Sequence, residues 1–183
     1  MLLGKQTDSL SMHIKQADVG FNQGIRAERA SMDATQIIPI KDPGDLAAAL
    51  AIREIVFIEE QGVPQEVERD DEDETAFHVL AVRGGHAIGT GRLVTTQPPP
   101  DQETGKWGRI GRMAVLASNR RGGVGRQILH ALEQHAREQS LNGIVLHAEV
   151  LSEGFYQREG YAAFEAVFEE AGMPHVRMSK KLK

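Results

Sequence analysis

The stretch RMAVLASNRRGGVGRQILHALEQHA, residues 112–136, joins an apolar run to a helical pattern through a turn rich in glycine and arginine. The run 106–116 predicts a strand, and the nearly continuous apolar segment GIVLHAEV (143–150) predicts a second strand covered on both faces. Strand, turn, helix and strand in this order predict a βαβ unit with parallel strands. The turn therefore lies at the amino end of a helix, where free N–H groups and the helix dipole favour an anion.

The helix after this turn is predicted to run for about four turns. Glu133 and Arg137 are expected to form an i,i+4 pair on its exposed side. Its core stripe is expected to consist of Val124, Ile128, Leu132, His135 and Ala136.

The composition of the turn itself predicts a phosphate site. Its glycines have no Cβ, so backbone amides can approach a bulky oxyanion, and its arginines can add charge-assisted hydrogen bonds. The turn lacks the Lys and hydroxyl of a Walker loop and the third glycine of a dinucleotide fingerprint. What remains is R-x-x-G-x-G after a strand reading R-x-A-V (112–115). The residues predicted to hold phosphate are Arg120, Arg121, Gly122, Gly123, Val124, Gly125 and Arg126.

Length and composition predict one globular domain, and the order of strands and helices predicts that it is α/β. The 183 residues are 40% hydrophobic, which suffices for one core, and the polar, aperiodic segment 1–31 is expected to be a poorly ordered extension before the domain 32–183. Met32 is a hypothetical alternative start, because the first strand signal follows it. The net charge of -5 argues against a general nucleic-acid binder.

Several classes of site and location are also disfavoured. The chain has no cysteine, hence no disulfide or thiolate nucleophile, and its seven histidines are scattered without a zinc spacing. We expect no metal. No segment resembles a membrane span or a signal peptide, so a cytoplasmic protein with no membrane partner is expected.

Further elements are predicted on both sides of the acidic run. Residues 35–40 predict a strand, and residues 42–62 predict a helix with an Asp42 cap, Pro43 in its first turn and Gly62 as its end. The apolar face of this helix is expected to consist of Leu46, Leu50, Ile55 and Ile58. Residues 76–83 and 87–94 predict a hairpin, and 95–105 a surface loop.

The run EVERDDEDE, residues 66–74, carries seven carboxylates and one arginine. An exposed, solvated loop is one interpretation. The other is an electrostatic field that draws a cationic substrate towards a nearby cleft.

These motifs resemble the GNAT superfamily of acyl-CoA-dependent N-acyltransferases over about residues 35–182. R-x-x-G-x-G resembles the pyrophosphate loop of that family, and GFYQREGY (154–161) resembles its second signature, in the same order. The segments 56–81 and 168–182 are similar to those of the ElaA-type subgroup. The resemblance implies a mixed, splayed sheet of six or seven strands flanked by helices, with acetyl-CoA as co-substrate.

The resemblance also implies roles for particular residues. Main-chain groups of Met113, Ala114 and Val115 would bind the thioester and pantetheine, and Tyr156 matches the usual general acid at the departing thiolate. Its neighbour Phe155 is expected in the core.

The sequence does not identify the general base. Glu149 stands where the subgroup often has glutamine, and it is either the base or a solvent-facing strand end. Four further residues are weaker candidates for contact with the acceptor, and each has an alternative structural role: Glu60, Gln61, His78 and His175.

The implied reaction is direct transfer of an acetyl group from acetyl-CoA to a primary amine of a small molecule or peptide in a ternary complex. One alternative is a non-catalytic acyl-CoA sensor. Another is an enzyme similar to acyl-homoserine-lactone synthases, because Arg53, Val56 and Phe57 precede an acidic run. A homodimer is possible.

Overall fold

The computed structural model describes residues 34–100 and 105–183. The predicted N-terminal extension and the alternative start at Met32 lie outside the described residues. The described chain forms an eight-stranded sheet with the order β1-β2-β3-β4-β5-β8-β6, to which β7 is added through its pairing with β8. The expected mixed, splayed sheet is confirmed, with two very short strands raising the number to eight.

All strand pairs are antiparallel except β4 and β5, which are parallel as the βαβ prediction requires. The strands are β1 (Gln36–Pro39), β2 (Phe77–Arg83), β3 (His86–Thr96), β4 (Trp107–Val115), β5 (Gly143–Glu149), β6 (Ala162–Ala163), β7 (Phe168–Glu170) and β8 (Met173–Lys181). The predicted hairpin between β2 and β3 turns at two glycines with positive φ, Gly84 and Gly85.

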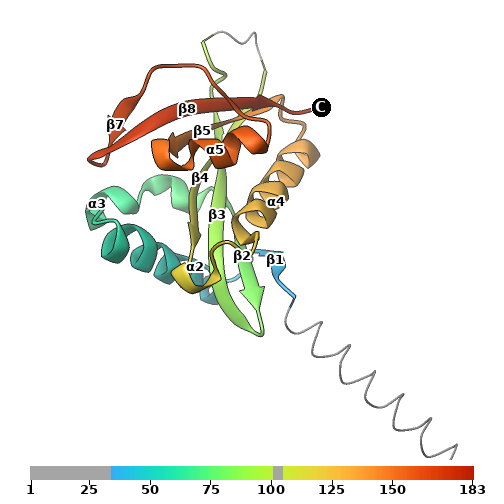
Figure 1. The fold of residues 1–183 in the computed structure, drawn as a ribbon. Coiled ribbons are helices and arrows are strands. Elements are labelled where there is room, and N and C mark those ends of the chain that lie inside the picture. Colours follow the sequence, from blue (N-terminus) through green and yellow to red (C-terminus); the bar gives the residue numbers. More distant parts are fainter. Residues whose placement is uncertain (1–33, 101–104) are drawn as a thin grey trace, which may run out of the picture.

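Helices cover both faces of the sheet (Figure 1). Helix α4 (Val124–Glu138) packs on one face, and α2 (Pro43–Arg53) packs on the other with the π-helical turns η1 (Glu54–Glu60) that continue it. The shorter segments are α3 (Gln65–Glu68), η2 (Asp71–Glu74), η3 (Ala117–Asn119), η4 (Val150–Ser152) and α5 (Glu153–Arg158). Within the described ranges, no helix has the length and apolarity needed to cross a membrane.

The helix predicted over 42–62 forms with its Asp42 cap, which accepts from the Asp45 amide at 2.9 Å. Its predicted apolar face was wrong, since Ile55 is 37% exposed. The side chains that face the sheet are instead Ala49, Ile52, Arg53 and Val56. The spacing of four, five and three in the predicted face is not helical, and the buried set includes an arginine that periodicity of apolar residues could not find.

The core stripe of α4 is confirmed for Val124, Ile128, Leu132 and Ala136, which are at most 1% exposed. His135 is half-buried and stacks on Phe77, with ring centroids 3.5 Å apart. The prediction that Glu133 lies on the exposed side was wrong.

Glu133 is 2% exposed because three groups from β8, the segment before β6 and its own helix surround its carboxylate. Lys180 Nζ donates to it at 2.8 Å, the Tyr161 hydroxyl at 3.0 Å and Arg137 at 3.2 Å. These partners compensate the burial of its charge.

Strands β4 and β5 pair only over Trp107–Arg109 and Gly143–Val145, and then they separate. Beyond this point β4 carries an irregularity opposite Gly91, where Arg112 has a φ of +52°. A Cβ at Gly91 would lie 2.8 Å from Ile128, so the glycine lets α4 approach β3 closely. The gap between the two central strands positions the candidate site.

Candidate functional site

The glycine turn offers unpaired backbone amides at the start of α4. Gly123 is the N-cap with a φ of +76°, and Arg121 before it has a φ of +65°. The amides of the first helical turn have no intrahelical acceptor, and no described side chain caps them. A Cβ at Gly123 would meet nothing within 4 Å, so the space beside these amides is open. The turn therefore fits an anion held by main-chain groups.

The arginines of this turn already have protein partners. Arg120 donates to the Val115 carbonyl at 2.9 Å and to the carboxylate of Glu60 at 2.5 Å. Arg126 pairs with Glu159 at 3.1 Å. Among the described residues, Arg121 has no carboxylate partner. The positive charge available to a phosphate is thus smaller than the sequence suggests.

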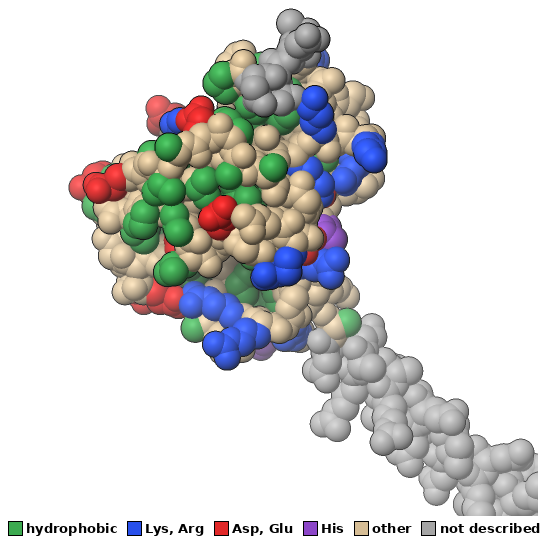
Figure 2. Space-filling model, turned by 45° about the horizontal axis from the view of Figure 1, so that its top comes forward, with side chains coloured by type: hydrophobic (Ala, Val, Ile, Leu, Met, Phe, Trp, Pro, Cys, Tyr) green, Lys and Arg blue, Asp and Glu red, His purple; other side chains and the backbone are tan. Residues whose placement is uncertain are grey.

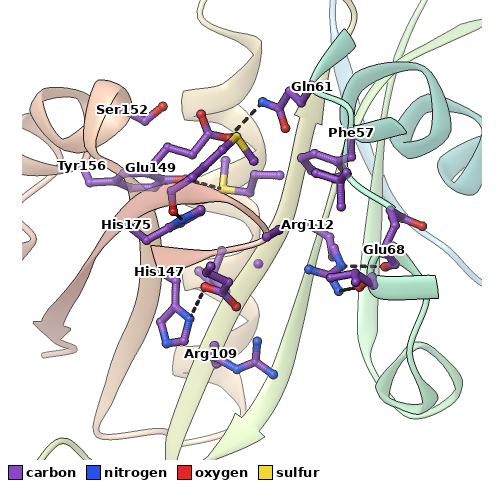
Figure 3. A pocket seen from close by; sticks show the side chains of 18 residues that line it. Phe57, Gln61, Glu68, Arg109, Arg112, His147, Glu149, Ser152, Tyr156 and His175 are labelled. Carbon is purple, nitrogen blue, oxygen red and sulfur yellow. Dashed lines mark hydrogen bonds and ion pairs between the residues drawn. The ribbon is translucent and has the colours of Figure 1, made fainter. Parts of the chain in front are cut away.

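A pocket of about 240 Å³ lies where β4 and β5 separate (Figure 3). Strands β4 and β5 form two walls, the end of η1 and helix α5 form the rim, and the turn between β7 and β8 closes one side. The lining residues are Phe57, Gln61, Val63, Val67, Glu68, Arg109, Ile110, Gly111, Arg112, Met113, His147, Glu149, Ser152, Tyr156, Glu170, Ala171, Met173 and His175.

Several residues predicted from the sequence line this pocket: Gln61, Met113, Glu149, Tyr156 and His175. Gln61 Nε2 donates to Glu149 Oε1 at 3.0 Å, so η1 is bridged to the end of β5. His175 Nδ1 donates to the Met173 carbonyl at 2.9 Å. Their roles in binding or catalysis stay predictions.

Other predicted residues lie elsewhere. Glu60 contacts Arg120 at the glycine turn, and His78 is buried with its Nε2 donating to the Asp73 carbonyl at 3.0 Å. Burial lowers the pKa of His78. Ala114 is buried against α2, and neither it nor Val115 lines the pocket. The structure therefore gives no support for Glu60 or His78 as acceptor contacts.

Tyr156 lies between the core and the pocket. Its hydroxyl has one hydrogen-bond partner in the described part of the chain, the sulfur of Met113 at 3.7 Å, and its ring meets Phe155 and Tyr161 edge to face. Burial and, secondly, the charge of Glu149 raise the pKa of Tyr156 to about 12. The phenol therefore remains protonated near neutral pH and acts as a hydrogen-bond donor.

The acidic segment 66–74 is a solvated loop only in part. Glu66, Asp71 and Glu74 are exposed and have no ion-pair partner among the described residues, whereas the other four carboxylates pair with arginines. Glu68 is 2% exposed and pairs with the equally buried Arg53. Arg53 also donates to Asp73 at 2.7 and 2.9 Å. Arg92 donates to both oxygens of Asp70 at 2.6 Å. Figure 2 shows acidic side chains as separate spots on one face rather than as a continuous patch.

These ion pairs shift the titration of the segment. Hydrogen bonds and charge from Arg92 lower the pKa of Asp70. For Asp73, burial opposes ionisation, but hydrogen bonds and charges of Arg53 and Arg92 outweigh burial and lower the pKa. Two more arginines complete the network from β4, since Arg109 pairs with Glu72 and Arg112 with Asp70 at 3.0 Å.

The structure adds site residues that the sequence reasoning missed. His147 Nδ1 donates to Glu170 Oε2 at 2.8 Å, and Arg109 and Arg112 line the β4 wall. Polar residues at 147 and 149, alternating within an otherwise apolar strand, are a signal that could have indicated a functional face. In residues 34–100 and 105–183, no three His, Asp or Glu side chains are grouped to hold a metal ion.

Comparisons with known proteins agree with this geometry. The protein-family model for the acetyltransferase (GNAT) domain matches residues 45–182 of this chain. The Bacillus subtilis protein YjcF, named an uncharacterised N-acetyltransferase, is 34% identical over 141 residues, 76% of this chain and 95% of its own. The crystal structure of an acyl-CoA N-acyltransferase from Pseudomonas aeruginosa is 27% identical with a TM-score of 0.68, covering 80% of this chain and 99% of that one.

Escherichia coli ElaA is 25% identical with a TM-score of 0.67, over 80% of this chain and 99% of its own. The acyl-homoserine-lactone synthase LasI has a TM-score of 0.65 at 19% identity over 82% of this chain and 90% of its own, which shows a shared fold alone. The βαβ unit with its glycine turn, the splayed strands and the match over residues 45–182 lead to one conclusion: the chain belongs to the GNAT acetyltransferase family.

Proposed function

We propose that the protein transfers an acetyl group from acetyl-CoA directly to a primary amine in a ternary complex. The observation that carries this proposal is the placement of two sites along one gap. The glycine turn with its free amides follows β4, and the pocket with Tyr156 and Glu149 lies between β4 and β5. A long ligand with a diphosphate at one end could therefore reach both.

The residues present fit the diphosphate of coenzyme A. The amides of the turn around Gly123 and the side chain of Arg121 would hold it, and main-chain groups of β4 near Met113 would bind the arm. The bound thioester supplies an activated acyl carbon. The amine nitrogen forms its bond to this carbon as the carbon–sulfur bond breaks, and the sulfur leaves as a thiolate.

Proton removal from the acceptor is the heavier requirement. An amine of pKa about 10.4 is mostly protonated at pH 7, which costs about 4 to 5 kcal/mol if nothing takes its proton. Glu149 is our candidate for the group that accepts this proton, because it lines the pocket and its only hydrogen-bond partner among the described residues is the Gln61 amide. Tyr156 would donate a hydrogen bond to the departing thiolate.

Two measurements test the proposal. Isothermal titration with acetyl-CoA and with a longer acyl-CoA measures donor binding and acyl preference. Thiol release is then followed with polyamines, amino acids, aminoglycosides and lysine peptides as acceptors. Amine-dependent release supports an N-acetyltransferase, whereas tight binding without release across the panel would support a non-catalytic acyl-CoA sensor. Absence of binding would refute both.

A further inference from the structure

Two arginines line one side of the pocket and two carboxylates line the other (Figure 3). Glu68 also lies on the arginine side, where its charge is paired with that of Arg53. His147 and His175 lie on the carboxylate side. Arg109 and Arg112 lie on β4, and Glu149 lies across from Arg112 on the wall formed by β5, together with Glu170 from β7. In the described part of the chain, no arginine lies within 4.0 Å of Glu149 or Glu170. The two walls therefore face one another without a direct ion pair.

The β4 wall has N–H groups left for a ligand. Arg112 is held through Nε by the Glu68 carbonyl at 2.9 Å, and through Nη2 by the Val67 carbonyl and Asp70 at 3.0 Å. Its Nη1 has no acceptor in the described residues. Arg109 uses only Nη2, towards Glu72. No side-chain nitrogen in the described residues is both buried and without a partner, so these remaining N–H groups are open to solvent.

The opposite wall offers carboxylates without a permanent cation. Glu149 accepts from the Gln61 amide, and Glu170 accepts from His147. The hydrogen bond and the charge of His147 lower the pKa of Glu170 against the opposing effect of burial, and the charges of His175 and Arg112 add smaller contributions.

We propose that the acceptor is a free amino acid, with its ammonium group at Glu149 and its carboxylate at the guanidinium groups of Arg109 and Arg112. This inference rests on the proposed function and names its substrate class. A carboxylate can bind guanidinium N–H groups that a simple amine leaves without an acceptor. A polyamine would place a second cation next to two arginines, which disfavours it.

Matched acceptors test the inference. Thiol release is measured with common L-amino acids, and for the best of them with its primary amide and with the amine that lacks the carboxyl group. All three retain a primary amine, so only the carboxylate differs. We expect loss of the carboxylate to lower kcat/KM by about tenfold or more, the size of a lost charge-assisted hydrogen bond. Equal kcat/KM values for the three acceptors would overturn the inference.

Substitutions of the two arginines test whether they bind the carboxylate of the acceptor. Arg109→Gln and Arg112→Gln should each reduce the preference for the carboxylate. Arg109→Gln is the safer variant, because the one hydrogen-bond partner of the Arg109 side chain among the described residues is Glu72. Arg69→Gln is the matched control, since Arg69 is half exposed, pairs with Glu54 at 3.9 Å and does not line the pocket. A preference unchanged in both Arg109→Gln and Arg112→Gln would contradict the assignment.

Failure of the proposed function is distinguishable from failure of this inference. If acetyl-CoA binds but no acceptor releases thiol, the enzymatic proposal fails. Thermal unfolding with coenzyme A then compares the amino acids with their amides. A larger rise in Tm with the amino acids would support the carboxylate site, and equal rises would overturn it.

Discussion

Replacing Tyr156 by phenylalanine tests how the leaving thiolate is stabilised. The pKa of Tyr156 is about 12, whereas a thiol has a pKa of about 8.5. Full transfer of the phenolic proton would therefore be uphill by about 5 kcal/mol. A hydrogen bond to a charged group is worth about 1.5 to 3 kcal/mol, or roughly 10- to 150-fold in rate. We expect Tyr156→Phe to lower kcat by one to two orders of magnitude.

The assay is single-turnover thiol release at saturating acetyl-CoA, with the unfolding free energy measured in parallel. Stability should change by less than about 1 kcal/mol, because the hydroxyl contacts only the Met113 sulfur at 3.7 Å. Tyr161→Phe is the control, since its hydroxyl binds Glu133 in the core and not the pocket. A loss of more than four orders of magnitude in kcat for Tyr156→Phe would refute hydrogen-bond stabilisation in favour of full proton transfer.

Three further substitutions test the site and its support. Glu149→Gln should remove the acid limb of the kcat/KM against pH profile, and an unchanged profile would exclude Glu149 as the base. Glu68→Gln should lower the unfolding free energy in a denaturant titration by about 3 kcal/mol, because it leaves Arg53 buried with one partner fewer. The control is Arg69→Gln, which removes an exposed ion pair with Glu54 at 3.9 Å and should change the unfolding free energy by less than about 1 kcal/mol. Folding lowers the pKa of Asp73, so the ionised carboxylate stabilises the fold above about pH 4, and this stabilisation is lost as the pH falls. Asp73→Asn should therefore make the unfolding free energy fall less steeply with decreasing pH. An equally steep fall would contradict this.

Local patterns predicted the elements that form the proposed donor site. The order of strand, glycine turn and amphipathic helix fixed the parallel pair β4 and β5 and the free amides at the start of α4. The hairpin glycines Gly84 and Gly85 and the Asp42 cap were likewise predictable. Each depends on residues within a few positions of one another, where spacing and backbone preference suffice.

The partners of charged residues were not predictable in this way. The acidic segment 66–74 reads as solvated until Arg53, Arg92, Arg109 and Arg112 are brought to it from α2, β3 and β4. Glu133 likewise becomes buried only when β8 brings Lys180 to it. An arginine inside a predicted buried element indicates that an acidic partner must lie beside it, but the local sequence does not identify that partner.

The sequence by itself therefore determined the family fold, the glycine turn and the tyrosine beside the gap. Tertiary structure alone decided that four carboxylates of the acidic run pair with arginines, that Glu60 binds Arg120, and that two arginines face Glu149 and Glu170 across one pocket. The physical reason is the separation along the sequence of the residues that interact. Helix caps, turns and periodicity act over a few residues, whereas an ion pair or a pocket wall depends on which distant strands the sheet places side by side.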